Sequence, residues 1–126
     1  MRVIIIGGGA AGASCATRLR RLNEDAEIII LERTGEVSIA NCGLPYYISD
    51  VIPNRDSILV STPQKFKSWF NIDVRLETEV VEINKEEKFV LTSFNEKLSY
   101  DYLVLANGAS PIVPEFAGLN KDKTFV

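Results

Sequence analysis

Three glycines near the start of the chain have the spacing of a nucleotide-binding loop. Gly7, Gly9 and Gly12 directly follow a short apolar run, residues 3–6, and a helix-forming segment comes next. In this order the first glycine permits a tight turn, the second lets the backbone approach a pyrophosphate, and the third lets the helix pack against the strand. The pyrophosphate would lie at the helix N-terminus, where free N–H groups favour negative charge.

An acidic residue stands where such a loop needs a partner for a ribose. The second apolar run, residues 26–31, is followed at once by Glu32, about 20 residues after Gly12. A carboxylate there bonds a ribose hydroxyl, and it disfavours a ligand that carries a 2′-phosphate. The alternative is an ordinary βαβ unit with a glycine turn and a solvated glutamate. The loop predicts a dinucleotide site without distinguishing FAD from a nicotinamide nucleotide.

A single cysteine, Cys42, has the setting of a reactive thiol. It lies in the segment Ser38-Ile-Ala-Asn-Cys-Gly-Leu-Pro-Tyr-Tyr-Ile48, in which a turn gives way to a short helix. The dipole of a helix stabilises a thiolate near its N-terminus and so raises the reactivity of the thiol. Asn41 and Ser38 could add polar contacts. The alternative is a structural cysteine buried beside a proline-containing turn, and the spacing alone does not decide between the two.

Two arginines lie one turn apart on the helix expected after the glycine loop, residues 13–22. At about 100° per residue, Arg18 and Arg21 share a stripe with Ser14. A neighbouring stripe is predicted to face the core and consists of Cys15, Leu19 and Leu22. On these residues alone the arginines favour a solvated helix face, and contact with an anionic ligand is the alternative.

Apolar runs predict the strands that must position these residues. Residues 3–6 and 26–31 are continuous runs, residues 73–76 form a shorter strand, and residues 102–106 form a continuous run suited to a central parallel strand. The last run ends in the loop Asn107-Gly-Ala-Ser-Pro111, at a strand's carboxyl end, where the ligands of such sheets gather. The predicted fold class is therefore α/β with a parallel central sheet.

A helix is predicted between the second and third of these strands, and an antiparallel ribbon between the third and fourth. Thr62 suits the N-cap of the helix and Pro63 suits its first position. The helix carries an aromatic stripe predicted to face the core, namely Phe66, Trp69 and Phe70. Three runs then alternate like an antiparallel ribbon: residues 80–84, 89–94 and 97–100.

Length and composition suit one domain and exclude several classes of partner. The 126 residues are 46% hydrophobic, enough for a packed core. A net charge of −3, with no basic run longer than Arg20-Arg21, gives no reason to expect nucleic-acid or membrane binding. Two distant cysteines and no histidine predict no metal site. A reducing cytoplasm is the default location.

The chain resembles the N-terminal flavin domain of the pyridine nucleotide-disulfide oxidoreductases. The likeness lies in the glycine loop, Leu31-Glu32-Arg33, the Cys42 segment and Tyr100-Asp-Tyr-Leu-Val-Leu-Ala-Asn-Gly-Ala-Ser-Pro111, which follow one another in the family's order. The Cys42 segment is specific to the single-cysteine branch, which contains coenzyme A-disulfide reductases and NADH oxidases or peroxidases. The resemblance implies a Rossmann-like FAD-binding domain over residues 1–126, with a parallel central sheet and an antiparallel β-ribbon.

The resemblance also implies the cofactors, which are FAD at this motif and NAD(P)H as electron donor. The glycine loop would cradle the FAD pyrophosphate, Glu32 would hold its ribose, and the Val80 backbone would meet its adenine. The implied cofactor-binding residues are Gly7, Gly9, Ala10, Ala11, Gly12, Glu32, Arg33, Val80, Ala106, Asn107 and Gly108. Asn107 replaces the threonine usual in the family, although its side chain keeps the capacity to form hydrogen bonds.

By the same resemblance, Cys42 is the redox-active residue beside the flavin ring. With no neighbouring resolving cysteine, its oxidised form must be a sulfenic acid or a mixed disulfide with a small thiol. Coenzyme A-disulfide reductases bind their substrate with residues that match Ser14, Arg18, Arg21, Ser38 and Asn41. The arginine stripe would then supply positive charge to an anionic ligand. A basic residue often found in this branch just before residue 73 is replaced by Phe70.

Several functions are compatible with these parts, and reduction of coenzyme A disulfide is favoured. NADH oxidases and peroxidases carry a histidine in the glycine loop, which here reads Gly9-Ala-Ala-Gly12. Persulfide or polysulfide reduction would use the same thiol. An alternative of a different class is a flavin-binding module without catalysis, or a folded fragment that holds no cofactor.

The family fold includes parts that this sequence does not contain: a nicotinamide domain, a second flavin segment and a dimerisation domain. We therefore expect the 126-residue chain to bind FAD weakly and to be inactive alone with NAD(P)H. The complete protein is expected to be a homodimer.

Overall fold

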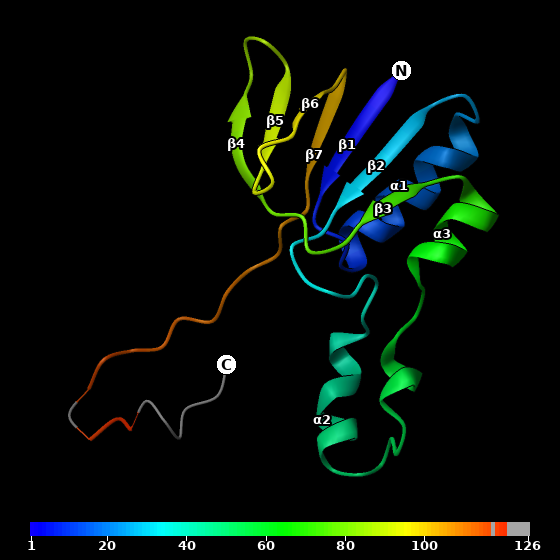
Figure 1. The fold of residues 1–126 in the computed structure, drawn as a ribbon. Helices are drawn as coiled ribbons and strands as arrows, with labels where there is room; N and C mark the ends of the chain where they lie inside the picture. The colour runs from blue at the N-terminus through cyan, green and yellow to red at the C-terminus, as the bar shows by residue number, and fades with distance from the viewer. Residues whose placement is uncertain (117, 121–126) are drawn as a thin grey trace.

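A computed structural model describes residues 1–116 and 118–120, and these residues have the predicted α/β architecture (Figure 1). The helices, of which η1 and η2 are 3-10 helices, and the strands are, in chain order, β1 Arg2–Ile6, α1 Ala10–Leu22, β2 Glu27–Leu31, η1 Asn41–Gly43, α2 Leu44–Ile48, η2 Arg55–Ile58, α3 Pro63–Phe70, β3 Asp73–Arg75, β4 Val80–Asn84, β5 Phe89–Thr92, β6 Lys97–Ser99 and β7 Tyr102–Leu105. A parallel sheet has the order β3-β2-β1-β7, and an antiparallel ribbon has the order β4-β5-β6.

The parallel sheet is covered on both faces, which is why β1 and β2 are almost continuously apolar. Alternate residues of these strands point to opposite faces. The face toward α1 and α3 contributes Val3, Ile5, Ile28 and Ile30 to a cluster that includes Ala16 and Phe66. The opposite face contributes Ile4, Ile29 and Leu31 to a cluster completed by Val90 and Leu98 of the ribbon. The ribbon is thereby fixed against the sheet that carries the glycine loop.

The predicted N-cap and first residue of α3 are confirmed, but one of its three predicted core residues is exposed. The Thr62 hydroxyl accepts a hydrogen bond from the backbone N–H of Lys65, and Pro63 begins the helix. Phe66 and Phe70, one turn apart, pack together with ring centroids 6.4 Å apart. Trp69 was expected in the same stripe but is 72% exposed, with the Lys65 ammonium 5.9 Å from its ring centroid. The buried stripe of this short helix is too narrow to include a residue at i+3.

The C-terminal end of α1 is held by Arg20, which is buried. Its guanidinium donates to five backbone carbonyl oxygens, those of Asn23, Glu24, Ala26, Phe70 and Asn71. These acceptors join the end of α1 to the start of β2 and the end of α3. Leu22, predicted to be a core residue, is 67% exposed because it lies in the last turn beyond this contact.

The position of β7 corrects a third expectation. The run at residues 102–106 was predicted to be a central strand, yet among the described residues β7 pairs only with β1 and forms an edge of the sheet. Tyr102 and Leu105 are each 62% exposed. Residues 106–116 have no regular secondary structure, and no helix of the described residues is long and apolar enough to cross a bilayer.

Between β2 and α3 the chain makes a long excursion that carries Cys42. In Figure 1 the segment containing α2 and η2 extends away from the sheet as a separate arm. The two sides of the arm are tied by a bridge between Ile39 and Leu59, and by a 2.8 Å hydrogen bond from the N–H of Ala40 to the carbonyl of Ile58.

Candidate functional site

A cavity of about 430 Å³ lies at the carboxyl ends of β1, β2 and β7. Eight of the predicted cofactor-binding residues line it: Gly7, Gly9, Glu32, Arg33, Val80, Ala106, Asn107 and Gly108. A larger depression of about 630 Å³ lies around the N-terminal ends of β2 and β3, where Glu27 and Asp73 are found, and contains none of these residues. The predicted set is thus brought to one place by the sheet topology, since parallel strands end at a common edge.

The glycine loop has the close contacts that its spacing predicts. A Cβ on Gly12 would overlap the carbonyl oxygen of Gly7, so the start of α1 packs directly against the turn. A Cβ on Gly9 would meet no protein atom within 4 Å, which leaves its backbone open to the cavity. This arrangement fits a phosphate group. The backbone at Gly9 is open to a ligand, whereas Gly12 packs closely against the turn at Gly7.

Helix α1 begins at Ala10, three residues before the predicted start. Ala10 and Ala11 are exposed in its first turn, whereas Gly12 is buried, and none of the three lines the cavity. The N-cap Gly9 offers no side chain to the first turn, and that turn holds no acidic residue. The N–H groups at this end therefore keep their capacity to bind an anion.

Glu32 is engaged with the protein on both carboxylate oxygens. Oε2 accepts a 2.7 Å hydrogen bond from the N–H of Gly8, and Oε1 accepts from the N–H and the hydroxyl of Thr34, each at 2.9 Å. A carboxylate offers about four acceptor positions, so these three bonds leave capacity for a ribose hydroxyl. The hydrogen bond from Gly8 therefore orients the Glu32 carboxylate toward the glycine loop.

Two further segments close the cavity. The N–H of Thr78 donates to the carbonyl of Glu32 at 2.9 Å, and the N–H of Ala106 donates to the carbonyl of Ile6 at 2.8 Å. The lining residues that the sequence did not single out are Ile6, Leu31, Thr34, Thr78 and Glu79, whereas Ala109 and Ser110 belong to the loop at residues 107–111 where a ligand was expected. The signal for those five was proximity in sequence, since each lies within two residues of a predicted one.

Cys42 lies in a 3-10 turn that leads into α2, the turn and short helix that the sequence predicted, and its side chain is exposed. The alternative of a buried structural cysteine is therefore wrong. Asn41, its neighbour in the chain, lines the cavity, although Cys42 itself does not. The N–H of Ser38 donates to the carbonyl of Gly8 at 2.8 Å, which ties the Cys42 segment to the glycine loop.

The base of the Cys42 arm is also held by an ion pair. Arg55 donates from Nη1 and Nη2 to the two carboxylate oxygens of Glu36, with 2.6 Å between Nη2 and Oε2. This hydrogen bonding from Arg55 lowers the pKa of Glu36 below its ordinary value. The pair connects η2 to the loop that follows β2.

The other predicted substrate residues lie on one exposed surface of α1. Ser14, Arg18 and Arg21 are all exposed, and neither arginine forms an ion pair with another residue in the described part of the chain. Arg20, between them in sequence, has the opposite role of a buried structural contact. Within the described ranges no three His, Cys, Asp or Glu side chains come together as a metal site.

Comparison with known proteins gives a consistent result. The family described as pyridine nucleotide-disulphide oxidoreductase matches residues 1–126. An NADH oxidase of Methanocaldococcus jannaschii is 40% identical over 129 residues, covering 99% of this chain and 29% of the relative. A coenzyme A disulfide reductase of Staphylococcus epidermidis is 42% identical over 114 residues, covering 86% and 26%. The chain thus spans less than a third of the length of these curated relatives.

Solved structures give the same fold. The reduced CoADR-RHD of Bacillus anthracis superposes with a TM-score of 0.84 at 50% identity, covering 90% of this chain and 21% of that one. An NAD-dependent persulfide reductase from A. fulgidus superposes with a TM-score of 0.86 at 42% identity, covering 90% and 22%.

Proposed function

Because the chain belongs to the pyridine nucleotide-disulphide oxidoreductase family, we propose that residues 1–126 are the first part of the FAD-binding domain of an NAD(P)H-dependent disulfide reductase. The observation that carries the proposal is the cavity at the strand ends. It gathers the glycine loop, Glu32 and the loop after β7, and it includes Asn41 from the turn that holds Cys42. Because Asn41 is the chain neighbour of the exposed Cys42, the cavity supports the proposal of a thiol beside a nucleotide site.

The chain's own residues suit the adenosine and pyrophosphate portions of FAD. The bare backbone at Gly9 and the first turn of α1 would hold the phosphates, and Glu32 would accept from the ribose. Val80 and residues 106–108 would form the side walls. When bound, FAD supplies an electron pair that originates from NAD(P)H.

Cys42 would perform thiol–disulfide exchange. Its thiolate attacks one sulfur of the substrate, the substrate's S–S bond breaks, and the first thiol leaves. The resulting mixed disulfide accepts an electron pair and a proton, which releases the second thiol and restores the Cys42 thiolate. Exposure of Cys42 in the 3-10 turn leaves room for a substrate larger than the thiol itself.

Coenzyme A disulfide is the proposed substrate. Arg18 and Arg21 form no ion pair among the residues described and stand free to bind phosphate groups, with Ser14, Ser38 and Asn41 as polar contacts. The names of two relatives, a coenzyme A disulfide reductase and the CoADR-RHD structure, support this choice. The absence of histidine from the sequence counts against oxygen or peroxide as oxidant, although one relative is named an NADH oxidase.

Persulfide reduction is the second candidate, and one observation favours it. The structure named as a persulfide reductase is 42% identical and superposes with a TM-score of 0.86. The Cys42 thiolate would attack one sulfur of the substrate's S–S bond, which breaks and releases the other sulfur as a thiolate or hydrosulfide.

The proposal for the whole protein includes a nicotinamide domain, a second flavin segment and a dimerisation domain, in a homodimer. A reducing cytoplasm would keep the free thiols Cys15 and Cys42 available.

Comparing oxidants tests the function. The whole protein, reduced with NADH, is mixed with coenzyme A disulfide, polysulfide or hydrogen peroxide, and flavin reoxidation is followed for the unmodified enzyme and for Cys42→Ser. We expect the disulfide to react fastest and the variant to lose that reaction. Faster reoxidation by peroxide would contradict the proposal, and faster reoxidation by polysulfide would favour the second candidate.

A further inference from the structure

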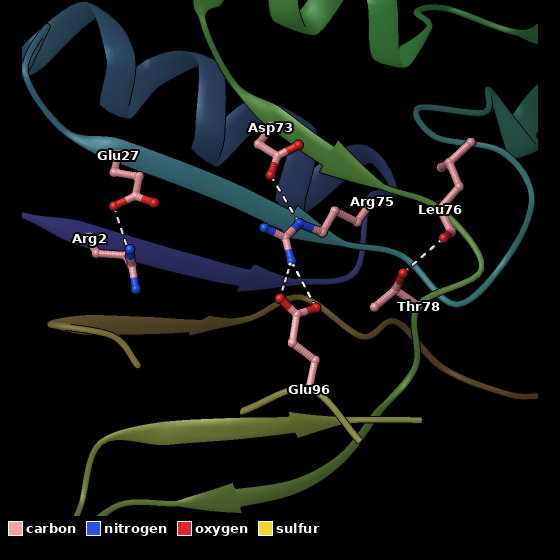
Figure 2. Close-up of polar contacts among 7 residues, drawn as sticks. All are labelled: Arg2, Glu27, Asp73, Arg75, Leu76, Thr78 and Glu96. Atoms are coloured by element: carbon pink, nitrogen blue, oxygen red, sulfur yellow. Dashed lines mark hydrogen bonds and ion pairs between the residues drawn. The ribbon is translucent and has the colours of Figure 1, made fainter. Parts of the chain in front are cut away.

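Arg75 joins the parallel sheet to the antiparallel ribbon through its side chain. Its Nε lies 3.0 Å from Oδ2 of Asp73, and its Nη1 lies 3.0 Å from both carboxylate oxygens of Glu96 (Figure 2). Glu96 belongs to the turn between β5 and β6, 21 residues further along the chain. The Arg75 side chain is about one-third exposed, so water screens the contact only in part.

The backbone of Arg75 begins a wall of the cavity. Its carbonyl accepts a 2.9 Å hydrogen bond from the N–H of Glu32, the proposed ribose ligand. Three residues later, the N–H of Thr78 donates to the carbonyl of Glu32. The Thr78 hydroxyl donates to the carbonyl of Leu76, as Figure 2 shows. Thr78 and the next two residues line the cavity. The wall is therefore a short connection between β3 and β4.

The far end of this wall is attached to the ribbon turn. The carbonyl of Glu79 accepts from the N–H of Ser93 at 2.8 Å, and Val80 pairs with Thr92. The Thr92 hydroxyl accepts from the N–H of Glu96 at 3.2 Å. The contact between Arg75 and Glu96 thus closes a ring that runs through the wall, the end of β5 and the turn. Breaking that contact removes the side-chain link across the ring and leaves the two ends of the wall held by backbone hydrogen bonds alone.

We propose that Arg75 is a positioning residue for flavin binding, acting through Glu96 to fix the wall at residues 78–80. The inference rests on the proposed flavin site. Arg75 and Glu96 lie outside the nucleotide-binding motif, and neither residue lines the cavity. Loss of either side chain should weaken FAD binding about three- to fivefold, the scale of one partly exposed ion pair.

A double-mutant cycle tests this role. FAD dissociation constants are measured by flavin fluorescence in the whole protein, for its unmodified form, Arg75→Met, Glu96→Ala and the double variant. We expect each single variant to bind FAD about three- to fivefold more weakly than the unmodified protein. The FAD dissociation constant of the double variant should not exceed the larger of the two single-variant values. Glu87→Ala is the matched control, since Glu87 pairs with Lys97 at 2.9 Å on the same ribbon without touching the wall.

Thermal unfolding separates positioning from general stability. Glu96→Ala and Glu87→Ala each remove one exposed ion pair and should lower Tm to a similar extent, yet only Glu96→Ala should change the FAD dissociation constant. Equal FAD affinity in Glu96→Ala and the unmodified protein, or multiplying effects in the double variant, would overturn the inference while leaving the flavin site intact. Failure of the unmodified protein to bind FAD would instead overturn the proposed function.

Discussion

The backbone N–H of Gly8 donates a 2.7 Å hydrogen bond to Oε2 of Glu32, joining the glycine loop to the end of β2. The carbonyl of the same residue accepts from the N–H of Ser38, the first residue of the Cys42 segment. A Cβ on Gly8 would lie 2.7 Å from Cγ2 of Val37. Gly8 occupies a variable position of the motif, yet it connects the proposed ribose ligand to the arm that carries the thiol.

Gly8→Ala should therefore impair both stability and flavin binding. The added methyl group must displace the buried Val37, an overpacking that costs about 1–3 kcal/mol of unfolding free energy. Denaturant unfolding and FAD titration measure the two effects. Gly35→Ala is the control, because a Cβ there would find only the Glu77 carboxylate, 3.9 Å away. Wild-type behaviour of Gly8→Ala would show that this close approach does not matter.

Arg20 should be one of the most sensitive charged residues of the chain. Arg20→Ala would strand five backbone carbonyls, so we expect a loss of at least about 3 kcal/mol in unfolding free energy. Arg20→Lys should restore little, because an ammonium cannot reproduce the planar fork. The exposed Arg21→Ala should change stability by less than about 0.5 kcal/mol. A fully stable Arg20→Lys would contradict this description of the contact.

The ion pair at the base of the Cys42 arm predicts a pH dependence. Hydrogen bonding from Arg55 lowers the pKa of Glu36, so the folded state binds that proton more weakly than the unfolded state does. The stabilisation is fully present above the ordinary pKa of about 4.3 and is lost as the pH falls through the lower folded value. The difference in unfolding free energy between the unmodified protein and Glu36→Gln should therefore shrink from pH 6 to pH 3. A constant difference would mean that the ion pair contributes nothing.

Arg18 and Arg21 allow a direct test of the substrate. In the whole protein, Arg18→Ala and Arg21→Ala should each raise KM for coenzyme A disulfide about tenfold, with little change in kcat, since each charged hydrogen bond contributes about 1.5 kcal/mol. Steady-state kinetics with a small uncharged disulfide provide the control, because that substrate has no phosphate group for the arginines to bind. An unchanged KM for coenzyme A disulfide would show that both arginines belong to a solvated helix face and do not bind the substrate.

The sequence predicted what local chemistry determines and missed what depends on neighbours. The β-branched runs, the Thr62 cap and the glycine spacing act within a few residues, and all three predictions are confirmed. Helical periodicity correctly placed Phe66 in the core but could not give the width of the buried stripe, so Trp69 was misplaced. An apolar run likewise does not reveal which strands flank it, so the edge position of β7 was not foreseen.

Contacts from backbone to side chain were the least predictable part of the site. Gly8 contacts Glu32 only because the sheet brings the glycine loop and the end of β2 together, whereas Thr34 contacts Glu32 from two residues away in the chain. Arg20 and Arg21 are adjacent and identical in type, yet one is buried and the other exposed. Charge and composition cannot distinguish them, because the difference lies in which carbonyl groups the fold presents.

The central claim is that the Cys42 thiolate adjoins a flavin held at the strand ends, and absorption spectroscopy tests it directly. A thiolate in contact with oxidised flavin gives a long-wavelength charge-transfer band. We expect the whole protein, loaded with oxidised FAD and carrying Cys42 as a free thiol, to show that band, and Cys42→Ser with the same content of oxidised FAD to lack it. A band that persists in Cys42→Ser, or no band in the flavin-loaded unmodified protein, would contradict the account.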